Sequence, residues 1–426
     1  MEKKIISGWG RNKFIETENF FFSKENFNKA HDFITRGNGN SYGDTSLNKN
    51  IISFTKKKKI LFFDKKRGIV KTEPGISIGE LLEVTIKNNW ILSVIPGAKN
   101  VTIGGAIAND VHGKNHFNSG CFSEYIKEFT ILTAKMGVLN CSKTKNSELF
   151  KLTCGGLGLS GIITSVTISL RRTKSLFLVT KTIKCKSLKE MLIIFKKHNK
   201  SDYLVGWYDF FSKKDKFLIT TANHTDKFIA DIKDQKPLKL CLPSFFLNKF
   251  TIKIFNFFYF LLNKSNSKLV YYKKFFFPLD KFINWNKLYG NKGFYQYQFV
   301  IPEINSESNL KKIINVIKKS KFRPYLTVVK MMGRCNSNYL SFPIKGYSFA
   351  LDFKNEINVI KLFNKLDKII IKMNGRIYLA KDSSIKKDNF FKMYPKINDF
   401  KKILSKYSPS GKITSLQSSR LGITQG

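Results

Sequence analysis

The sequence predicts an α+β fold, because strand-like and helix-like segments mix without strict β-α-β alternation. Roughly the first 170 residues are rich in glycine and in short β-branched runs, which predict strands at 51–54, 68–73, 128–134 and 161–170. After Arg171 and Arg172 glycine becomes scarce, and segments rich in lysine and phenylalanine dominate. This change predicts a first domain over 1–175 and a second over 176–375, followed by a final section over 376–426.

Helices and further strands follow from hydrophobic spacing. Ile78, Leu82 and Ile86 recur at helical intervals and predict a helix over 76–89. A short helix is expected at 147–154, with Ser147 as its N-cap. Amphipathic helices are expected at 187–199 and 309–320, and strands at 293–302 and 325–333. Hydrophobic residues make up 42% of the 426 residues, which is enough for a sizeable core.

The formal net charge is +45, from 75 Lys+Arg against 30 Asp+Glu. Such a balance favours an anionic partner, namely nucleic acid, a lipid surface or a phosphorylated substrate. Heavy use of Lys, Asn, Ile and Phe is also typical of an AT-rich genome, and we assign most of the excess charge to that cause. A nucleic-acid-binding protein would interleave aromatic residues with arginine in a recognisable module. Arginine is scarce here, so we expect no nucleic-acid partner.

Cysteine spacing and the N-terminus indicate a cytoplasmic protein. The six cysteines are far apart and form no CxxC pair: Cys121, Cys141, Cys154, Cys185, Cys241 and Cys335. This spacing argues against a zinc ribbon or a thioredoxin-like site, and a reducing compartment fits best. The first residues, MEKKIISGWGRNKF, have no apolar stretch of a secretory signal.

The segment 245–262, FFLNKFTIKIFNFFYFLL, is the most apolar part of the chain. Lys249 and Lys253 lie within it, and a membrane-spanning helix would rarely tolerate them. We expect a helix that lies on a membrane surface, at the inner face of the plasma membrane. A core helix of the second domain is the alternative.

Two glycine-rich loops compete as phosphate-binding sites. In RGNGNSYGD (residues 36–44), Gly37, Gly39 and Gly43 allow close approach of the backbone to an anion, although an ordinary glycine turn is the alternative. GLGLSG (156–161) matches GxGxxG, but a dinucleotide fold needs a strand before it and a helix after it. The predicted order is the reverse, so we expect a tight turn that passes beside a flat cofactor.

Between these loops, residues 96–120 combine glycines with small and polar side chains. Ala106 and Ala108 leave room for a bulky group, and Thr102 supplies a hydroxyl. His112 and His116 are four residues apart, as in some metal sites. Glycine and asparagine between them argue against a helix, so we expect no metal.

The three blocks RGNGNSYGD, PG…TIGGAIANDVHG and LFKLTCGGLGLSGIIT, in this order, resemble the FAD-binding domain of the vanillyl-alcohol-oxidase-type (PCMH-type) flavoenzymes. Further blocks at 112–116, 295–302, 328–333, 340–353 and 375–384 are similar to the decaprenylphosphoryl-β-D-ribose 2′-oxidases. This similarity covers nearly the whole chain and is weakest from about 175 to 275. It implies a two-part FAD-binding domain with an inserted α+β substrate domain, the last section returning to the FAD domain.

The resemblance implies FAD-dependent oxidation of a sugar hydroxyl. The expected substrate is a polyprenyl-phosphoryl ribose, oxidised at its 2′-hydroxyl as the first step of epimerisation to arabinose for the cell envelope. A short-chain reductase would be the partner enzyme. The alternative is a soluble aldonolactone or alditol oxidase of the same fold.

Site residues are likewise implied by the resemblance. The expected catalytic residues are Lys381, His112 and Tyr42, and the expected substrate-binding residues are Gln298, Lys330 and Lys114. The residues expected to line FAD are Arg36, Gly37, Asn38, Gly39, Asn40, Ser41, Tyr42, Gly43, Asp44, Gly97, Thr102, Ile103, Gly104, Gly105, Asn109, Asp110, Val111, His112, Ile163 and Tyr378. Residues 240–275 correspond to a mobile or membrane-proximal segment near the substrate entrance.

Several details of this chain refine the expectation. Covalent members of the superfamily often attach FAD to a histidine of the first loop, but the matching residue here is Asn40, so we expect non-covalent FAD. The family's pocket cysteine is replaced by Ala350. A buried lysine such as Lys381 could accept the hydroxyl proton when neutral. Gln296 and Gln298 are two apart in a strand and share one face, which suits sugar hydroxyls, although a solvent-facing strand is the alternative.

Overall fold

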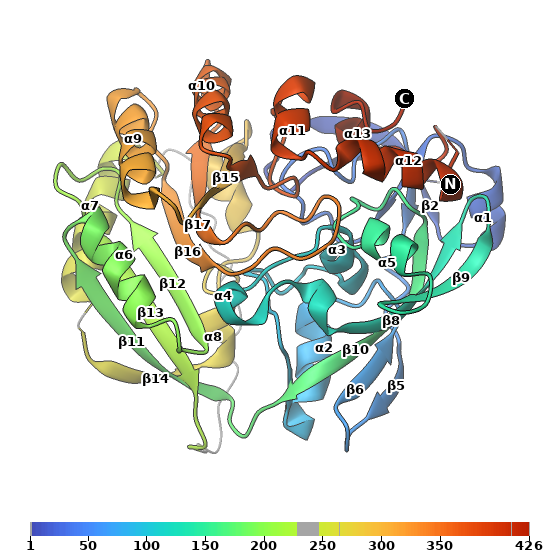
Figure 1. Cartoon of the computed structure of the whole chain (residues 1–426), viewed down its shortest axis with the longest axis horizontal. Coiled ribbons are helices and arrows are strands. Elements are labelled where there is room, and N and C mark those ends of the chain that lie inside the picture. The colour runs from blue at the N-terminus through green and yellow to red at the C-terminus, as the bar shows by residue number, and fades with distance from the viewer. Residues whose placement is uncertain (1, 228–246, 264, 410, 426) are drawn as a thin grey trace.

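The computed structural model describes residues 2–227, 247–263, 265–409 and 411–425. Three β-sheets form two lobes, with both termini on the same lobe (Figure 1). The predicted α+β class is confirmed. None of the helices in the described residues is long and apolar enough to cross a membrane.

The N-terminal sheet has four strands in the order β1 (Glu2–Ser7), β2 (Phe14–Phe21), β4 (Asn50–Ser53) and β3 (Phe33–Arg36). Helix α1 (Lys24–Lys29) begins after Ser23, whose hydroxyl accepts from Asn26 N–H. Strands β3 and β4 are parallel, so the chain must cross over between them. The glycine-rich loop 36–44 is the start of that crossover.

The second sheet contains β5 (Ile60–Asp64), β6 (Ile69–Thr72), β10 (Ile162–Arg172), β8 (Ile126–Thr133) and β9 (Gly137–Ser142), with β7 (Trp90–Leu92) paired to β10. Its helical segments are α2 (Ile78–Thr85), η1 (Ile86–Asn88), α3 (Ile103–Ala108), α4 (His116–Ser119), η2 (Phe122–Tyr125) and α5 (Ser147–Thr153). The strands predicted at 68–73, 128–134 and 161–170 are confirmed as β6, β8 and β10. The predicted cap of α5 is wrong: Ser147 is its first helical residue, and Asn146, in the left-handed region, is the N-cap.

The third sheet has eight antiparallel strands, β14 (Ser267–Tyr271), β11 (Phe177–Cys185), β13 (Phe217–His224), β12 (Tyr203–Tyr208), β16 (Leu326–Met332), β17 (Gly346–Lys354), β15 (Phe294–Pro302) and β18 (Arg376–Ile377). Helices α6 (Leu188–Lys197), α9 (Ser306–Lys319) and α10 (Val359–Lys372) pack along it (Figure 1). Helix α9 begins three residues before the predicted segment. The short elements α8 (Tyr272–Phe276) and η4 (Trp285–Tyr289) connect β14 to β15.

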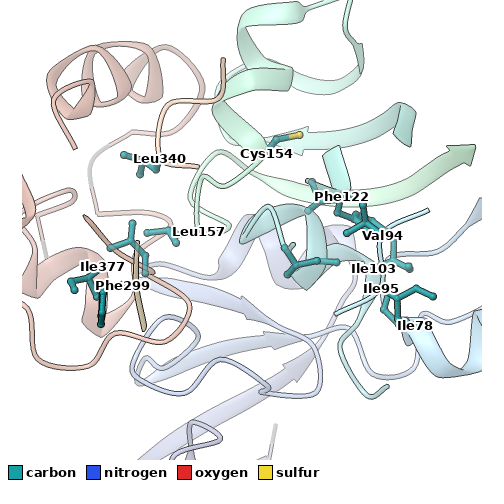
Figure 2. Close-up of a cluster of buried hydrophobic side chains, with 14 of the residues drawn as sticks. Ile78, Val94, Ile95, Ile103, Phe122, Cys154, Leu157, Phe299, Leu340 and Ile377 are labelled. Carbon is teal, nitrogen blue, oxygen red and sulfur yellow. The ribbon is translucent and has the colours of Figure 1, made fainter. Parts of the chain in front are cut away.

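The main hydrophobic core is shared by the two lobes. Ile103 and Phe122 of the first lobe belong to the same buried cluster as Phe299 and Ile377 of the eight-stranded sheet (Figure 2). Leu157, from the GLGLSG turn, is 4% exposed within that cluster. A shared core of this kind holds the lobes in a fixed relation, because separating them would expose apolar surface.

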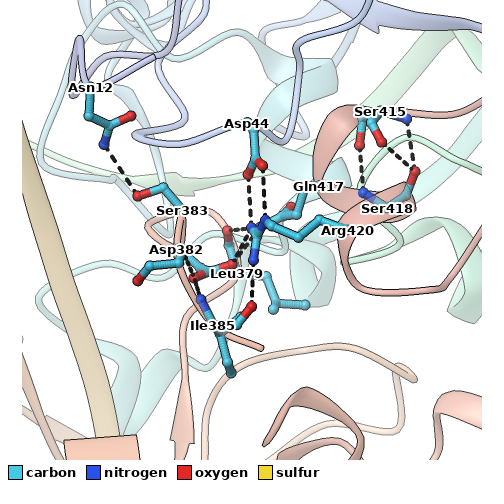
Figure 3. A network of polar contacts seen from close by, with 11 residues as sticks. Asn12, Asp44, Leu379, Asp382, Ser383, Ile385, Ser415, Gln417, Ser418 and Arg420 are labelled. Atoms are coloured by element: carbon cyan, nitrogen blue, oxygen red, sulfur yellow. Dashed lines mark hydrogen bonds and ion pairs between the residues drawn. The ribbon is translucent and has the colours of Figure 1, made fainter. Parts of the chain in front are cut away.

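The C-terminal section returns to the first lobe through α11 (Lys387–Met393), α12 (Ile397–Tyr407) and α13 (Leu416–Arg420). Thr414 N–H donates to the Phe33 carbonyl (2.8 Å). The Arg420 guanidinium binds the Asp44 carboxylate (2.9 Å) and the Asp382 carboxylate (2.8 Å), as Figure 3 shows. The chain crosses from the six-stranded to the eight-stranded sheet between Arg172 and Phe177, while the division into domains stays a prediction.

Helix α7 (Lys249–Leu262) lies on the surface of the second lobe. Phe250 is 71% exposed and Leu262 is 69% exposed, whereas Asn256 is buried and donates to Asp209 (2.7 Å). The alternative of a core helix is therefore wrong. Phe245, Phe246 and the rest of 240–246 lie outside the described residues.

Candidate active site

A large cavity lies where the two lobes meet. The first lobe contributes the glycine-rich loop after β3, the 96–112 segment and the GLGLSG turn, and the second contributes β15, β16, β17 and the 378–381 segment. Among the described residues that line it there is no carboxylate, whereas Arg36, Lys114, Lys330 and Lys381 all line it. The cavity therefore favours an anionic occupant.

Three adjacent strands form one wall of the cavity. Their register sets Gln298 beside Ala350 and Ala350 beside Val328, while Gln296 pairs with Asp352 and Lys330 with Ser348. Alternate side chains share a face, so Gln296 and Gln298 both line the cavity, as predicted. Tyr297 points to the opposite face, where its hydroxyl donates to Asp367 of α10 (2.7 Å). The alternative of a solvent-facing strand is wrong.

His112 is buried where the two lobes meet. Lys330 Nζ lies 3.4 Å from its Nδ1 atom, and Gln298 Nε2 lies 3.1 Å from its Nε2 atom. Burial, and then the charge of Lys330, lower the pKa of His112 well below its ordinary value. The imidazole is therefore neutral at pH 7. A neutral imidazole has one acceptor nitrogen, so His112 accepts either from Lys330 at Nδ1 or from the Gln298 amide N–H at Nε2.

His116 packs against the His112 ring. The two rings meet edge to face, with centroids 6.1 Å apart. His116 Nδ1 accepts from Gly333 N–H (3.0 Å), and burial lowers its pKa to about 3. No cluster of metal ligands occurs in the part of the chain that the structure describes.

Burial strongly affects the three lysines of the cavity. It lowers the pKa of Lys381 to about 7, that of Lys114 to about 7 and that of Lys330 to about 8. Lys381 Nζ lies 3.6 Å from the centre of the Tyr42 ring. Lys114 Nζ donates to the Phe275 and Phe276 carbonyls. Each amine can therefore exchange a proton near neutral pH, which is the condition for general acid–base work.

The glycine-rich side has the features of a cradle for a large anionic group. The backbone N–H groups from Asn38 to Ser41 donate to no other group in the described chain. Asn109 Oδ1 and Thr45 Oγ1 are buried, and neither has a hydrogen-bond partner among the described residues. A side chain added at Gly97 would meet nothing within 4 Å. Unsatisfied polar groups and open space along one wall fit a nucleotide cofactor such as FAD.

Gly39 shows why this loop needs glycine. Its φ is +66°, and a Cβ there would come 2.1 Å from the Arg36 guanidinium. That guanidinium donates to the Ser7 carbonyl (2.7 Å) and the Ser46 carbonyl (3.1 Å). Arg36 therefore holds the loop in shape as well as lining the cavity.

Most of the residues predicted from the sequence come together in this cavity. Lys381, His112, Tyr42, Gln298, Lys330 and Lys114 all line it, and so do all but four of the residues predicted for the cofactor. The four that do not line it are Gly43, Asp44, Ile103 and Asp110. Asp44 binds Arg420, and Asp110 accepts from Ser341 Oγ (2.7 Å), so both carboxylates are occupied by protein groups.

The structure adds residues that the sequence did not indicate. Trp9, Thr45, Phe276, Leu279 and Trp285 also line the cavity. No local motif marks Trp9, Phe276, Leu279 and Trp285, because they come from segments far apart in the chain, whereas Thr45 directly follows the glycine-rich loop. Tyr378, which was predicted, donates its hydroxyl to the Asn109 carbonyl (3.0 Å) and ties the two lobes together.

Comparisons with known proteins agree with this geometry. The family described as "FAD binding domain" matches residues 26–142, and the family described as "D-arabinono-1,4-lactone oxidase" matches residues 168–420. The decaprenylphosphoryl-beta-D-ribose oxidase of Mycolicibacterium smegmatis is 32% identical over 91% of this chain and 88% of its own length. The L-gulonolactone oxidase of Scyliorhinus torazame is 24% identical over 88% of this chain and 86% of its own. The chain therefore belongs to the PCMH-type family of FAD-dependent oxidoreductases acting on CH–OH groups, which includes these enzymes.

Proposed function

We propose that this protein oxidises the 2′-hydroxyl of a polyprenyl-phosphoryl ribose, the first step of epimerisation to arabinose. The proposal is carried by the charge of the cavity. Lys114, Lys330 and Lys381 line it, and none of the described residues that line it is a carboxylate. A neutral sugar acid lactone needs no such charge, whereas a phosphoryl sugar does. The similarity to a decaprenylphosphoryl-beta-D-ribose oxidase over most of both chains supports the same substrate class.

The glycine-rich wall would hold FAD without a covalent bond. Residues proposed to contact it are Arg36, Gly37, Asn38, Gly39, Asn40, Ser41, Tyr42, Gly97, Thr102, Gly104, Gly105, Asn109, Val111, His112, Ile163 and Tyr378. Neither histidine nor cysteine occurs within residues 36–44, so the loop lacks the side chains to which FAD is often attached covalently. Bound FAD supplies the acceptor for the hydride that leaves the sugar carbon.

Lys381 is proposed as the base that accepts the hydroxyl proton at its Nζ atom. Its pKa of about 7 leaves part of the population neutral at physiological pH. A neutral amine can take the proton, and the resulting ammonium is stabilised by the face of the Tyr42 ring. His112 and Gln298 would orient the sugar, and Lys330 and Lys114 would bind its negative charge.

The apolar end of the cavity supports a lipid-linked substrate. Trp9, Leu279 and Trp285 line the cavity and belong to one apolar cluster, and Phe276 also lines the cavity. Trp285 belongs to an aromatic cluster against which Leu247, just before α7, and Ile252, within α7, are packed. The cavity wall is thus continuous with the helix that exposes the most apolar surface. A soluble polyol would gain nothing from this arrangement.

Helix α7 is proposed to contact the inner face of the plasma membrane. Phe250, Phe257, Phe258 and Leu261 are at least half exposed. Lysines accompany them: Lys216 Nζ lies 5.3 Å from the centre of the Phe257 ring. Exposed apolar side chains beside cations fit an anionic lipid surface. This contact would bring the cavity close to a polyprenyl carrier.

Epimerisation also requires a second enzyme. Oxidation at one carbon yields a ketone, and reduction from the opposite face of that ketone inverts the configuration. This site performs the first half only, so we propose a short-chain reductase as partner.

The test is anaerobic mixing of the purified protein with candidate substrates while the flavin absorbance is followed. A polyprenyl-phosphoryl ribose should bleach the flavin, whereas an aldonolactone or alditol should do so poorly. Fast bleaching by the lactone and none by the phosphoryl sugar would establish the alternative, a soluble aldonolactone or alditol oxidase.

A further inference from the structure

A buried carboxyl group, that of Asp352, acts through its charge on the proposed catalytic lysine without lining the cavity. Asp352 is 0% exposed on β17, two residues from Ala350 and on the same face of the sheet. Its Oδ1 atom accepts from Gln296 Nε2 at 2.5 Å, and its Oδ2 atom accepts from the Tyr289 hydroxyl at 3.5 Å. A buried carboxyl with few donors is costly unless an opposite charge is near.

Tyr42 connects this carboxyl to Lys381. Its ring is stacked under Lys381 Nζ, 3.6 Å from centre to nitrogen. Gln296, the side chain that donates to Asp352, also acts on the Tyr42 hydroxyl, where it opposes the rise in the Tyr42 pKa that burial causes. Lys381, Tyr42, Gln296 and Asp352 therefore form a continuous chain of contacts from the cavity into the protein.

We infer that Asp352 is a positioning residue that holds Tyr42 beneath Lys381 through Gln296 and provides the buried counter-charge for the Lys381 ammonium. The inference rests on the proposed role of Lys381. Without this carboxyl, Lys330 would be the principal charged neighbour of Lys381, and both are cations. The base would then lose its proton too readily and would hold the proton taken from the sugar poorly.

The charges around the pair agree with this role. Burial lowers the pKa of Lys381, the charge of Asp352 opposes that shift and the charge of Lys330 adds to it. Burial raises the pKa of Asp352 to about 7, and Lys381 opposes that shift. Among the other titratable groups, Tyr42 and Tyr289 interact with Asp352, and Lys330 and His112 interact with Lys381. Asp280 acts on Tyr42.

The experiment measures the protonation of Lys381 directly in the FAD-loaded protein. A small acylating reagent reacts with the neutral amine only, and mass spectrometry of the Lys381 peptide gives the rate at each pH. In Asp352→Asn the midpoint of this profile should move to lower pH, with acylation up to about twofold faster near pH 7 for a shift of about one pKa unit. Near pH 5 the two proteins should react alike, because a carboxyl with a pKa of about 7 is already protonated there. Exposed Lys365 is the internal reference.

Asp367→Asn is the matched control. Asp367 is also buried and bonded to a tyrosine hydroxyl, but it lies on the opposite side of β15 from the cavity. Its loss should leave the Lys381 midpoint unchanged. An unchanged midpoint in Asp352→Asn, with FAD retained, would overturn the inference, as would an equal shift in Asp367→Asn.

If Asp352→Asn does not accumulate as folded protein, the reciprocal variant at Lys381 tests the inference. Lys381→Met removes the charge that lowers the pKa of Asp352, so the infrared band of its protonated carboxyl should persist to higher pH. The band is assigned by its absence from the double variant. A band that titrates as in the wild type would also overturn the inference. Neither measurement uses substrate, so a wrong substrate proposal would leave both results intact.

Discussion

The ammonium of Lys381 lies over the face of the Tyr42 ring, with 3.6 Å between Nζ and the ring centre. Attraction between a cation and an aromatic face favours the charged amine, whereas burial favours the neutral one. Burial lowers the pKa of Lys381 to about 7, while the charge of Asp352 opposes that shift and the charge of Lys330 adds to it. A group with this pKa can both accept a proton from a hydroxyl and release it afterwards within one catalytic cycle.

The rate of flavin reduction should therefore depend on pH. Lys381 accepts the proton only when neutral, so the rate should be low below pH 7, rise through about pH 7 and level off above it. Anaerobic stopped-flow with saturating substrate measures this profile. A rate that is flat from about pH 6 to pH 8 would remove Lys381 as the base.

Lys381→Ala should bind FAD normally and slow flavin reduction on the order of 10²–10⁴-fold, the usual scale for a general acid–base group. Lys365→Ala removes an exposed lysine of α10 and serves as the control. Both proteins should show the same flavin content by absorbance. If the two variants reduce their flavin equally fast, Lys381 does not take part in proton transfer.

Local patterns in the sequence predicted much of this site, because some geometry is set by neighbouring residues. Alternation along one strand was enough to turn Gln296 and Gln298 toward the cavity. Asp352 was missed because its role depends on which strands pair with β17, and that pairing is set by residues distant in sequence. Asp44 was predicted to line the cofactor, but it binds Arg420, 376 residues away.

Gly39→Ala should weaken FAD retention. The added Cβ would lie 2.1 Å from the Arg36 guanidinium, in a backbone conformation with φ of +66°. Gly137→Ala is a close control, since its φ is +65° but nothing lies within 4 Å of the added atom. Both variants bear a backbone strain of roughly 1–2 kcal/mol. The difference in their flavin content after gel filtration therefore measures the effect of the clash in the cavity loop alone. Equal flavin content would show that the loop adapts.

Acid or heat should release free FAD from the protein. The loop 36–44 carries asparagine at position 40 and contains neither histidine nor cysteine. After precipitation the supernatant should contain the yellow colour, measured by its absorbance and by chromatography against authentic FAD. Colour that stays with the washed precipitate would mean a covalent bond at another residue.

Membrane contact through α7 should be lost without loss of the fold when its exposed side chains are changed. Deleting the helix would also remove Asn256, which is buried and donates to Asp209, so substitutions are the better test. Phe250→Ser, Phe258→Ser and Leu262→Ser remove side chains that are 71%, 51% and 69% exposed. Each large apolar side chain buried in lipid contributes about 1.5–3 kcal/mol.

The triple variant should therefore sediment poorly with anionic vesicles and keep its flavin spectrum. A triple variant at exposed apolar positions elsewhere, Phe14→Ser, Phe62→Ser and Ile357→Ser, is the control and should bind like the wild type. Wild-type binding should weaken as salt rises, because the attraction between lysines and anionic lipid is screened. Equal loss of binding in both triple variants would show that α7 has no special part in membrane contact. If neither the wild type nor the control binds anionic vesicles, the proposed membrane contact fails altogether.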